Sequence, residues 1–266
     1  MQSLFSSAPG PFRWWIVPVA YIGHLVVLLG MSMTGLPAAL GQIAIFLGYA
    51  ALATLLAVLV VRSAPGRALG VQPPARPLAV IAVAIAATVI TSLIERLGAG
   101  FSSDIAQSTT KVLTEMGWGT GRGTDLLLIF TICCAAPIGE EAIFRGLIFR
   151  GLHDSLRRLG GGLGSPVAAF GLAAAVSAFI FAQSHGGAGQ EPSVLIAIFL
   201  SGIVYALCYA LTGSLWAPVL AHGLNNTVAF AGAVFGAEQV SLLNQIAVLI
   251  MPFLTWALLW FWGRVS

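Results

Sequence analysis

The sequence predicts an all-α integral membrane protein, a polytopic bundle of about eight transmembrane helices. Of its 266 residues, 58% are hydrophobic and only 8% are charged, whereas soluble domains carry about 25% charged residues. Apolar segments cover most of the chain, and no polar block between them is long enough to fold separately. We therefore expect a single membrane domain over residues 1–266.

Eight apolar runs of roughly 20 residues each suit a hydrocarbon core about 30 Å thick. The expected spans are residues 14–31, 38–61, 78–93, 126–149, 167–182, 194–211, 215–235 and 242–262. The first begins at two interfacial tryptophans and is too long for the core of a signal peptide, so we expect it to be retained. His24 within it is expected to be packed and hydrogen-bonded, without a functional role.

The connections between the spans have distinct compositions. Residues 62–76 form a turn rich in proline and arginine, and Glu95 and Arg96 end the third span. Residues 98–124 are the long polar connection. Five of its residues fit either an amphipathic surface helix or a plain loop, namely Asp104, Ile105, Val112, Leu113 and Met116.

Small residues in the sixth span indicate close helix packing. Gly202, Ala206 and Ala210 recur at four-residue spacing, which lets a neighbouring helix approach closely. The three cysteines also lie inside apolar segments and are expected to be packing residues, with no disulfide and no zinc-binding spacing. They are Cys133, Cys134 and Cys208.

The basic residues indicate the orientation in the membrane. Arg13, Arg62, Arg67, Arg76, Arg145, Arg150, Arg157, Arg158 and Arg264 fall on one side of the expected topology, against Arg96, Lys111 and Arg122 on the other. The excess predicts that both termini face the cytoplasm. The expected location, a bacterial cell membrane, does not follow from this count. No dense basic patch interleaved with aromatic residues suggests a nucleic-acid partner.

Charged residues stand out in the fourth span. A charge at the bilayer centre costs about 2.5–3.5 kcal/mol on insertion scales, so intramembrane charges suggest function. Glu141 and Arg145 are four residues apart, share a helix face and are expected to form an ion pair. Glu140 points about 100° away from Glu141 and is free for another role.

Two later spans carry further polar residues. His185 follows the fifth span, while His222, Asn225 and Asn226 lie in the seventh. If the glycine-rich residues 160–164 turn a helical hairpin near residue 162, Glu140 (162 − 140 = 22 residues before) and His185 (185 − 162 = 23 after) lie level.

That hairpin would be long. At about 1.5 Å per residue its arms extend beyond the hydrocarbon core, so we expect it to project into the cytoplasm and to place Arg150, Arg157 and Arg158 in water. The loop from Gly186 to Pro192 would then start below the outer surface, and we expect it to be re-entrant and to line a cavity.

The chemistry that these residues fit is activation of water. Glu140 and His185 could share the proton of a water molecule as a general base, while His222 and Asn226, four residues apart on one helix face, could donate to an oxyanion. No serine or cysteine lies in a recognisable nucleophile setting. Zinc is an alternative that we rank lower, because the H-E-x-x-H spacing is absent and Arg145 would oppose a dication.

These motifs resemble those of the CAAX-protease and bacteriocin-processing family of intramembrane glutamate endopeptidases. The family pattern of E-E-x-x-x-R, F-x-x-x-H and H-x-x-x-N is met by Glu140, Glu141, Arg145, Phe181, His185, His222 and Asn226. The resemblance covers roughly residues 126–235, a four-span catalytic core between three N-terminal spans (14–93) and a final span (242–262).

The resemblance implies roles for these residues. Glu140 and His185 would activate water, and His222 with Asn226 would stabilise the oxyanion. Glu141 and Arg145 would brace the site, and Phe181 would shape it. The implied activity is hydrolysis of a peptide bond near the cytoplasmic side, without a cofactor, in a peptide or protein substrate that is membrane-attached or prenylated.

Structural explanations compete with these roles. Glu140 and Arg145 could form a packing network, His185 could cap a helix end, and His222 with Asn226 could link helices. Asn225 is expected to make such an interhelical link. The alternative functions are a non-catalytic membrane factor for bacteriocin immunity or scaffolding, a solute or proton carrier, and a zinc-dependent membrane protease.

Overall fold

The computed structural model describes residues 3–5, 8–97, 110–186, 191–235 and 242–265. Within these ranges the secondary structure is helical, without strands. The helices of the N-terminal part are α1 (Ile16–Ser32), α2 (Ala38–Val61), α3 (Pro65–Leu69) and α4 (Pro77–Leu97). Those that follow are α6 (Arg122–Phe130), η1 (Thr131–Ala135), α7 (Ala136–Glu141), η2 (Ala142–Phe149), α8 (Arg150–Leu159), α9 (Pro166–Ser184), α10 (Pro192–Thr212), α11 (Trp216–Phe235) and α12 (Leu242–Val265).

The prediction of a polytopic helical membrane protein is confirmed. Among the described residues, six helical segments are long and apolar enough to cross a membrane, and α1 is a shorter apolar helix. The helix α11, which we also expected to span, is 20 residues long but is not among those six. All eight expected spans are nevertheless helical.

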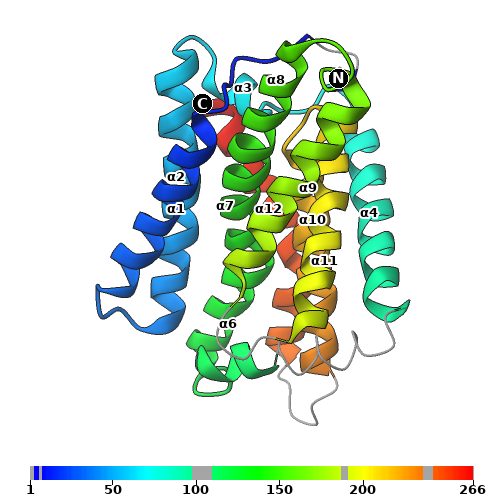
Figure 1. The fold of residues 1–266 in the computed structure, drawn as a ribbon. Coiled ribbons are helices and arrows are strands. Elements are labelled where there is room, and N and C mark those ends of the chain that lie inside the picture. The colour runs from blue at the N-terminus through cyan, green and yellow to red at the C-terminus, as the bar shows by residue number, and fades with distance from the viewer. Residues whose placement is uncertain (1–2, 6–7, 98–109, 187–190, 236–241, 266) are drawn as a thin grey trace.

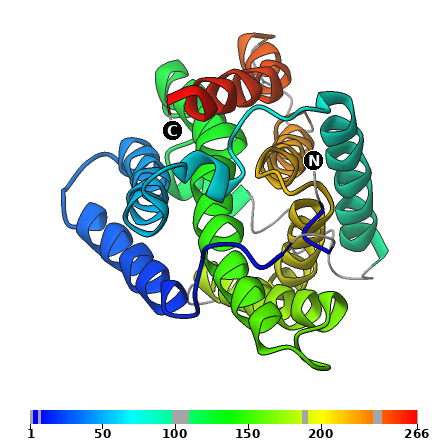
Figure 2. The same cartoon turned by 90° about the horizontal axis from the view of Figure 1, so that it is seen from above.

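One continuous segment, α6 to α8, occupies the middle of the bundle. Its apolar window is 72% buried, against 22–50% for the other five candidate spans. Figure 2 shows this green segment between α1 and α2 on one side and α4, α10 and α11 on the other. The chain termini lie at the same end of the bundle, beside α3 and α8 (Figure 1), as predicted.

The central segment is not a regular α-helix, which the sequence analysis did not foresee. Two π-helical stretches, η1 and η2, flank the short α7 that carries Glu140 and Glu141. Pro137, near the start of α7, lacks a backbone N–H and cannot continue the α-helical hydrogen-bond pattern. Such π segments are frequent at functional sites.

The predicted hairpin turns at the glycine cluster. Gly160 and Gly161 adopt left-handed conformations, with φ of 69° and 57°, which glycine accommodates without steric cost. The helix α9 then begins at Pro166, and the Ser165 hydroxyl accepts a hydrogen bond from the Ala168 amide at 3.3 Å. The hairpin therefore returns α9 alongside the central segment.

The expectation that three arginines lie in water is wrong for Arg150, whereas Arg157 and Arg158 are half-exposed and also bonded to backbone carbonyls. The Arg150 side chain is only 12% exposed and pairs with Asp154 at 3.0 Å. Arg158 donates to the carbonyl oxygens of Phe12 and Gly10, and Arg157 donates to Gly164 at 2.7 Å. The reason is tertiary: the segment preceding α1 packs over α8.

The N-terminal helices are tied to the later ones at the same end of the bundle. Leu215 donates its backbone N–H to the Gly70 carbonyl at 2.9 Å. The indole of Trp216 donates to Val71 at 2.9 Å, and the Tyr209 hydroxyl donates to Leu69 at 3.0 Å. The cysteines are buried and free, as predicted.

The predicted close approach at Gly202 is confirmed. A Cβ added there would lie 2.9 Å from the Ala178 Cβ on α9. Its carbonyl also accepts a hydrogen bond from Arg145 at 3.2 Å. The absence of a side chain at Gly202 thus lets α9 and α10 pack together around the arginine.

Replacing Gly202 with valine should destabilise the protein. We expect a loss of about 1–3 kcal/mol, because the added carbons must displace α9. The matched control is Gly171→Val on α9, where an added Cβ meets nothing within 4 Å. Thermal unfolding of both variants in detergent measures the difference, and equal midpoints for the two would refute the packing argument.

Candidate active site

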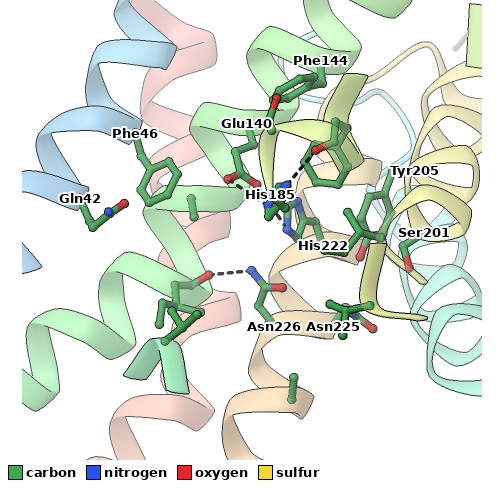
Figure 3. Close-up of a pocket in the computed structure, with 18 of the residues that line it drawn as sticks. Gln42, Phe46, Glu140, Phe144, His185, Ser201, Tyr205, His222, Asn225 and Asn226 are labelled. Atoms are coloured by element: carbon green, nitrogen blue, oxygen red, sulfur yellow. Dashed lines mark hydrogen bonds and ion pairs between the residues drawn. The ribbon is translucent and has the colours of Figure 1, made fainter. Parts of the chain in front are cut away.

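A cavity of about 480 Å³ lies beside the central segment, and all four predicted catalytic residues line it. Glu140 comes from α7, His185 follows α9, and His222 and Asn226 lie on α11. Figure 3 shows Glu140, His185 and His222 turned toward one another, with Asn226 and Asn225 on one side of them. Phe181 also lines the cavity, whereas Glu141 and Arg145 lie behind its wall.

Glu140 faces two imidazole rings. Its Oε1 lies 3.8 Å from His185 Nε2, and its Oε2 lies 3.7 Å from His222 Nε2. Both distances exceed a direct hydrogen bond but allow one water molecule to contact both partners. The prediction that Glu140 and His185 lie level is confirmed, and Glu140 faces the cavity instead of lipid.

The orientation of His185 fixes its tautomer. Its Nδ1 lies 2.8 Å from the Phe181 carbonyl oxygen, and since a carbonyl only accepts, Nδ1 must carry the hydrogen. In the neutral ring, Nε2 then presents a lone pair toward Glu140. A lone pair and a carboxylate that face each other need a hydrogen between them, which a bridging water molecule would supply.

His222 is held from behind by Glu141. Its Nδ1 donates to Glu141 Oε1 at 2.9 Å, which leaves Nε2 facing Glu140. The predicted ion pair of Glu141 with Arg145 is confirmed at 3.1 Å, with both side chains fully buried. Residue spacing within the central segment does not predict that this pair also orients His222.

The two asparagines have different partners. Asn226 donates one amide hydrogen to the Ile132 carbonyl at 2.9 Å, and an amide carries a second hydrogen that can donate elsewhere. Asn225 accepts from Thr91 at 2.8 Å and donates to Glu95 at 3.2 Å. The prediction that Asn225 links helices is therefore confirmed, because Thr91 and Glu95 lie on α4.

Phe181 packs against both histidines of the site and against Arg145. Its ring centroid lies 4.7 Å from that of His185 and 5.9 Å from that of His222. The Arg145 guanidinium lies 4.4 Å from the same centroid on the ring face. Phe181 thus lies between the Arg145 guanidinium and the cavity, and it limits where the two imidazoles can move.

His24 is a lining residue that the sequence analysis set aside. It is only 4% exposed, and its ring lies tilted against that of Tyr49, with 4.6 Å between centroids. The expectation that it is hydrogen-bonded is wrong for its Nδ1, which finds no partner among the described residues. A single histidine in an apolar span was the available signal.

The cavity lies in the half of the bundle that is farther from the chain termini. Its lining includes Leu28 near the end of α1, Gln42 near the start of α2, and Glu95 near the end of α4. Figure 1 places those helix ends opposite the termini. If the termini are cytoplasmic, as the arginine count predicts, this is the half of the bundle that is farther from the cytoplasm. The expectation of cleavage near the cytoplasmic side stays a prediction.

Two connections between the predicted spans, residues 98–124 and 186–192, are only partly described by the structure. Residues 110–115 are helical, and Val112, Leu113 and Met116 line the cavity. Leu113 is buried whereas Val112 is 43% exposed, as in an amphipathic helix at a surface. Asp104 and Ile105 lie outside the described residues. The predicted re-entrant loop, Gly186 to Pro192, also lies mostly outside them, at residues 187–190.

The segment that carries all these motifs is similar to a known protein family. The family model described as type II CAAX prenyl endopeptidase Rce1-like matches residues 122–228. We call residues 122–228 the Rce1-like segment, after the family that they resemble. The cavity walls contributed by α1 and α2, including His24 and Gln42, lie outside the Rce1-like segment.

A curated relative also matches part of the chain. The membrane-embedded CAAX protease MroQ of Staphylococcus aureus (strain USA300) is 30% identical to this chain over 100 residues, covering 38% of this chain and 36% of the relative. The match thus spans about a third of that protein's length. No solved structure matches the chain.

Proposed function

We propose that this chain is an intramembrane endopeptidase that hydrolyses a peptide bond with a water molecule activated by Glu140 and His185. The observation that supports the proposal most directly is the position of the Glu140 carboxylate, which faces the Nε2 atoms of His185 and His222 at 3.8 and 3.7 Å. Its placement in the Rce1-like segment supports the same reaction class.

In the proposed reaction, Glu140 takes a proton from the water while His185 Nε2 accepts the water's other hydrogen bond and orients it. The water oxygen attacks the carbonyl carbon of the substrate, and the carbonyl oxygen becomes an oxyanion. Glu140 then returns the proton to the nitrogen of the breaking C–N bond. The products are a carboxylate and an amine.

The oxyanion would accept hydrogen bonds from His222 and Asn226. His222 donates from Nε2 when its ring is protonated on both nitrogens, and the Glu141 carboxylate 2.9 Å from Nδ1 compensates that charge. Asn226 would use the amide hydrogen that Ile132 does not occupy. Glu141 and Arg145 act as positioning residues, since neither lines the cavity.

We infer that the substrate is a membrane-attached peptide or protein. The cavity walls are largely apolar, with Phe46, Phe144 and Phe181 among the lining residues, and apolar walls with a few placed polar groups suit a lipidated or membrane-inserted segment. The relative's name as a CAAX protease supports a prenylated C-terminal peptide as the first probe.

The test uses the purified protein in lipid nanodiscs. A farnesylated C-terminal peptide and a library of unmodified membrane-inserting peptides are incubated with it, and new termini are identified by mass spectrometry. We expect cleavage that persists in the presence of a chelator. Activity that disappears with chelator and returns with zinc would replace the metal-free mechanism, and intact peptides in every reaction would reject the protease.

We also infer that the termini face the cytoplasm of a bacterial cell and that the cavity therefore lies in the outer half of the membrane. A cysteine placed at Ser184, an exposed residue that lines the cavity, should react with an impermeant maleimide on intact cells. A cysteine placed at Arg67 on α3 should react only after permeabilisation.

The native cysteines give little background in this labelling, because all of them are buried. The opposite labelling pattern would place the cavity in the cytoplasmic half. That result would restore cleavage near the cytoplasmic side and reject the orientation predicted from the arginine count.

A further inference from the structure

A second cavity, of about 500 Å³, lies at the end of the bundle that carries the chain termini. Its apolar lining consists of Leu152, Leu156 and Leu159 on α8 with Leu172 and Val176 on α9. We call it the α8–α9 groove. Among the described residues, none lines both this groove and the candidate active site.

The polar residues of the groove are basic. Arg13 and Arg158 both line it, and they are close enough for their guanidinium groups to repel each other. Asp154 is the acidic residue that also acts on Arg158, but its carboxylate oxygens accept hydrogen bonds from Arg150 at 3.0 and 3.1 Å. An anion between Arg13 and Arg158 would relieve their repulsion.

The groove is also lined by a residue whose hydroxyl group is unsatisfied within the described part of the chain. Ser155 lines it, and its buried Oγ makes no hydrogen bond with the described residues. Buried hydroxyls in proteins are usually satisfied, so this atom suggests a ligand that accepts hydrogen bonds. A phosphate or an ester oxygen meets that requirement.

The position of the groove suits a lipid. Trp14 lines it and is 68% exposed, and tryptophans gather at the level of the headgroups. The outer ends of the apolar wall are open as well, with Leu159, Leu172 and Val176 exposed by 68%, 45% and 44%. Basic residues at the depth of the headgroups, next to an apolar groove, suit the binding of an anionic phospholipid.

We propose that the α8–α9 groove binds one anionic phospholipid from the leaflet that faces the chain termini. The phosphate lies between Arg13 and Arg158, the Ser155 hydroxyl donates to a lipid oxygen, and an acyl chain lies along the leucines and valine of α8 and α9. Because Arg158 also holds the carbonyl oxygens of Gly10 and Phe12, the lipid would secure the N-terminal segment against α8.

Native mass spectrometry of the full chain tests the proposal. The protein is titrated with phosphatidylglycerol and, separately, with phosphatidylcholine of the same acyl chains. We expect one phosphatidylglycerol to be retained preferentially, and Arg13→Gln should weaken its binding about fivefold. Val176→Trp should abolish binding by filling the groove, without loss of folding because the residue is 44% exposed.

The matched control is Arg76→Gln, an exposed arginine at the start of α4 that does not line the groove. It should bind phosphatidylglycerol as the unmodified chain does. Equal binding of the two lipids, or an Arg13→Gln variant that binds like the control, would overturn the proposal. Binding of glycerol phosphate alone with the same affinity would show an anion site without an acyl chain and would overturn it too.

Discussion

Replacing Glu140 with glutamine is expected to abolish peptide cleavage while leaving the fold intact. The amide has the shape of the carboxylate but cannot take the proton of the water, and general acid–base catalysis contributes roughly 10²–10⁴-fold to rate. Because Glu140 lies at 3.7 Å or more from both imidazoles, the substitution breaks no direct hydrogen bond to them. The rate of appearance of a new terminus in nanodiscs measures the loss.

The matched control is Glu191→Gln, an exposed carboxylate that precedes α10 and does not line the cavity. It should cleave at the rate of the unmodified chain. The thermal midpoints of both variants should stay close to that of the unmodified chain. Persistent cleavage by a folded Glu140→Gln variant would reject Glu140 as the base, and His185 would then be the next residue to test.

Replacing Arg145 with methionine should cause the largest loss of stability. Glu141 and Arg145 are both fully buried, and removing one partner of a buried pair leaves an uncompensated charge, which costs about 3–5 kcal/mol. The substitution also removes the guanidinium from the face of Phe181 and from the Gly202 carbonyl. Thermal or denaturant unfolding in detergent measures this loss.

Two comparisons isolate the buried charge as the cause. The double variant Glu141→Gln with Arg145→Met should recover most of the lost stability, because no unpaired charge remains. Arg264→Met, which removes an exposed arginine from the face of Trp260, should cost little. If Arg145→Met and Arg264→Met lose equal stability, the buried Glu141–Arg145 pair does not stabilise the fold as we expect.

Helix geometry explains which features could be predicted from the sequence. The Glu141–Arg145 pair follows from four-residue spacing on one helix, and the level positions of Glu140 and His185 follow from equal counts on either side of the glycine turn. The polar residues of the Rce1-like segment could be predicted for a different reason. They are few, and they stand in runs that are otherwise apolar.

Features that depend on contacts between distant segments could not be predicted. Arg150 is buried because the segment before α1 covers α8, and Asn226 reaches Ile132 across the cavity wall. His24 joins the site because α1 packs beside η2, which carries Phe144. In each case the partner is set by how two helices are rotated against each other, which residue spacing within one helix does not specify.

The sequence by itself determined that the protein is a helical membrane protein, because this follows from its composition. It also determined that Glu140 lies outside the Glu141–Arg145 ion pair and that His185 lies at the depth of Glu140, because both follow from the regular geometry of a helix. Only the tertiary structure decided that Glu141 holds His222, that α1 and α2 complete the cavity, and that the cavity lies away from the termini. Those outcomes depend on the packing of side chains between helices that are far apart in the chain.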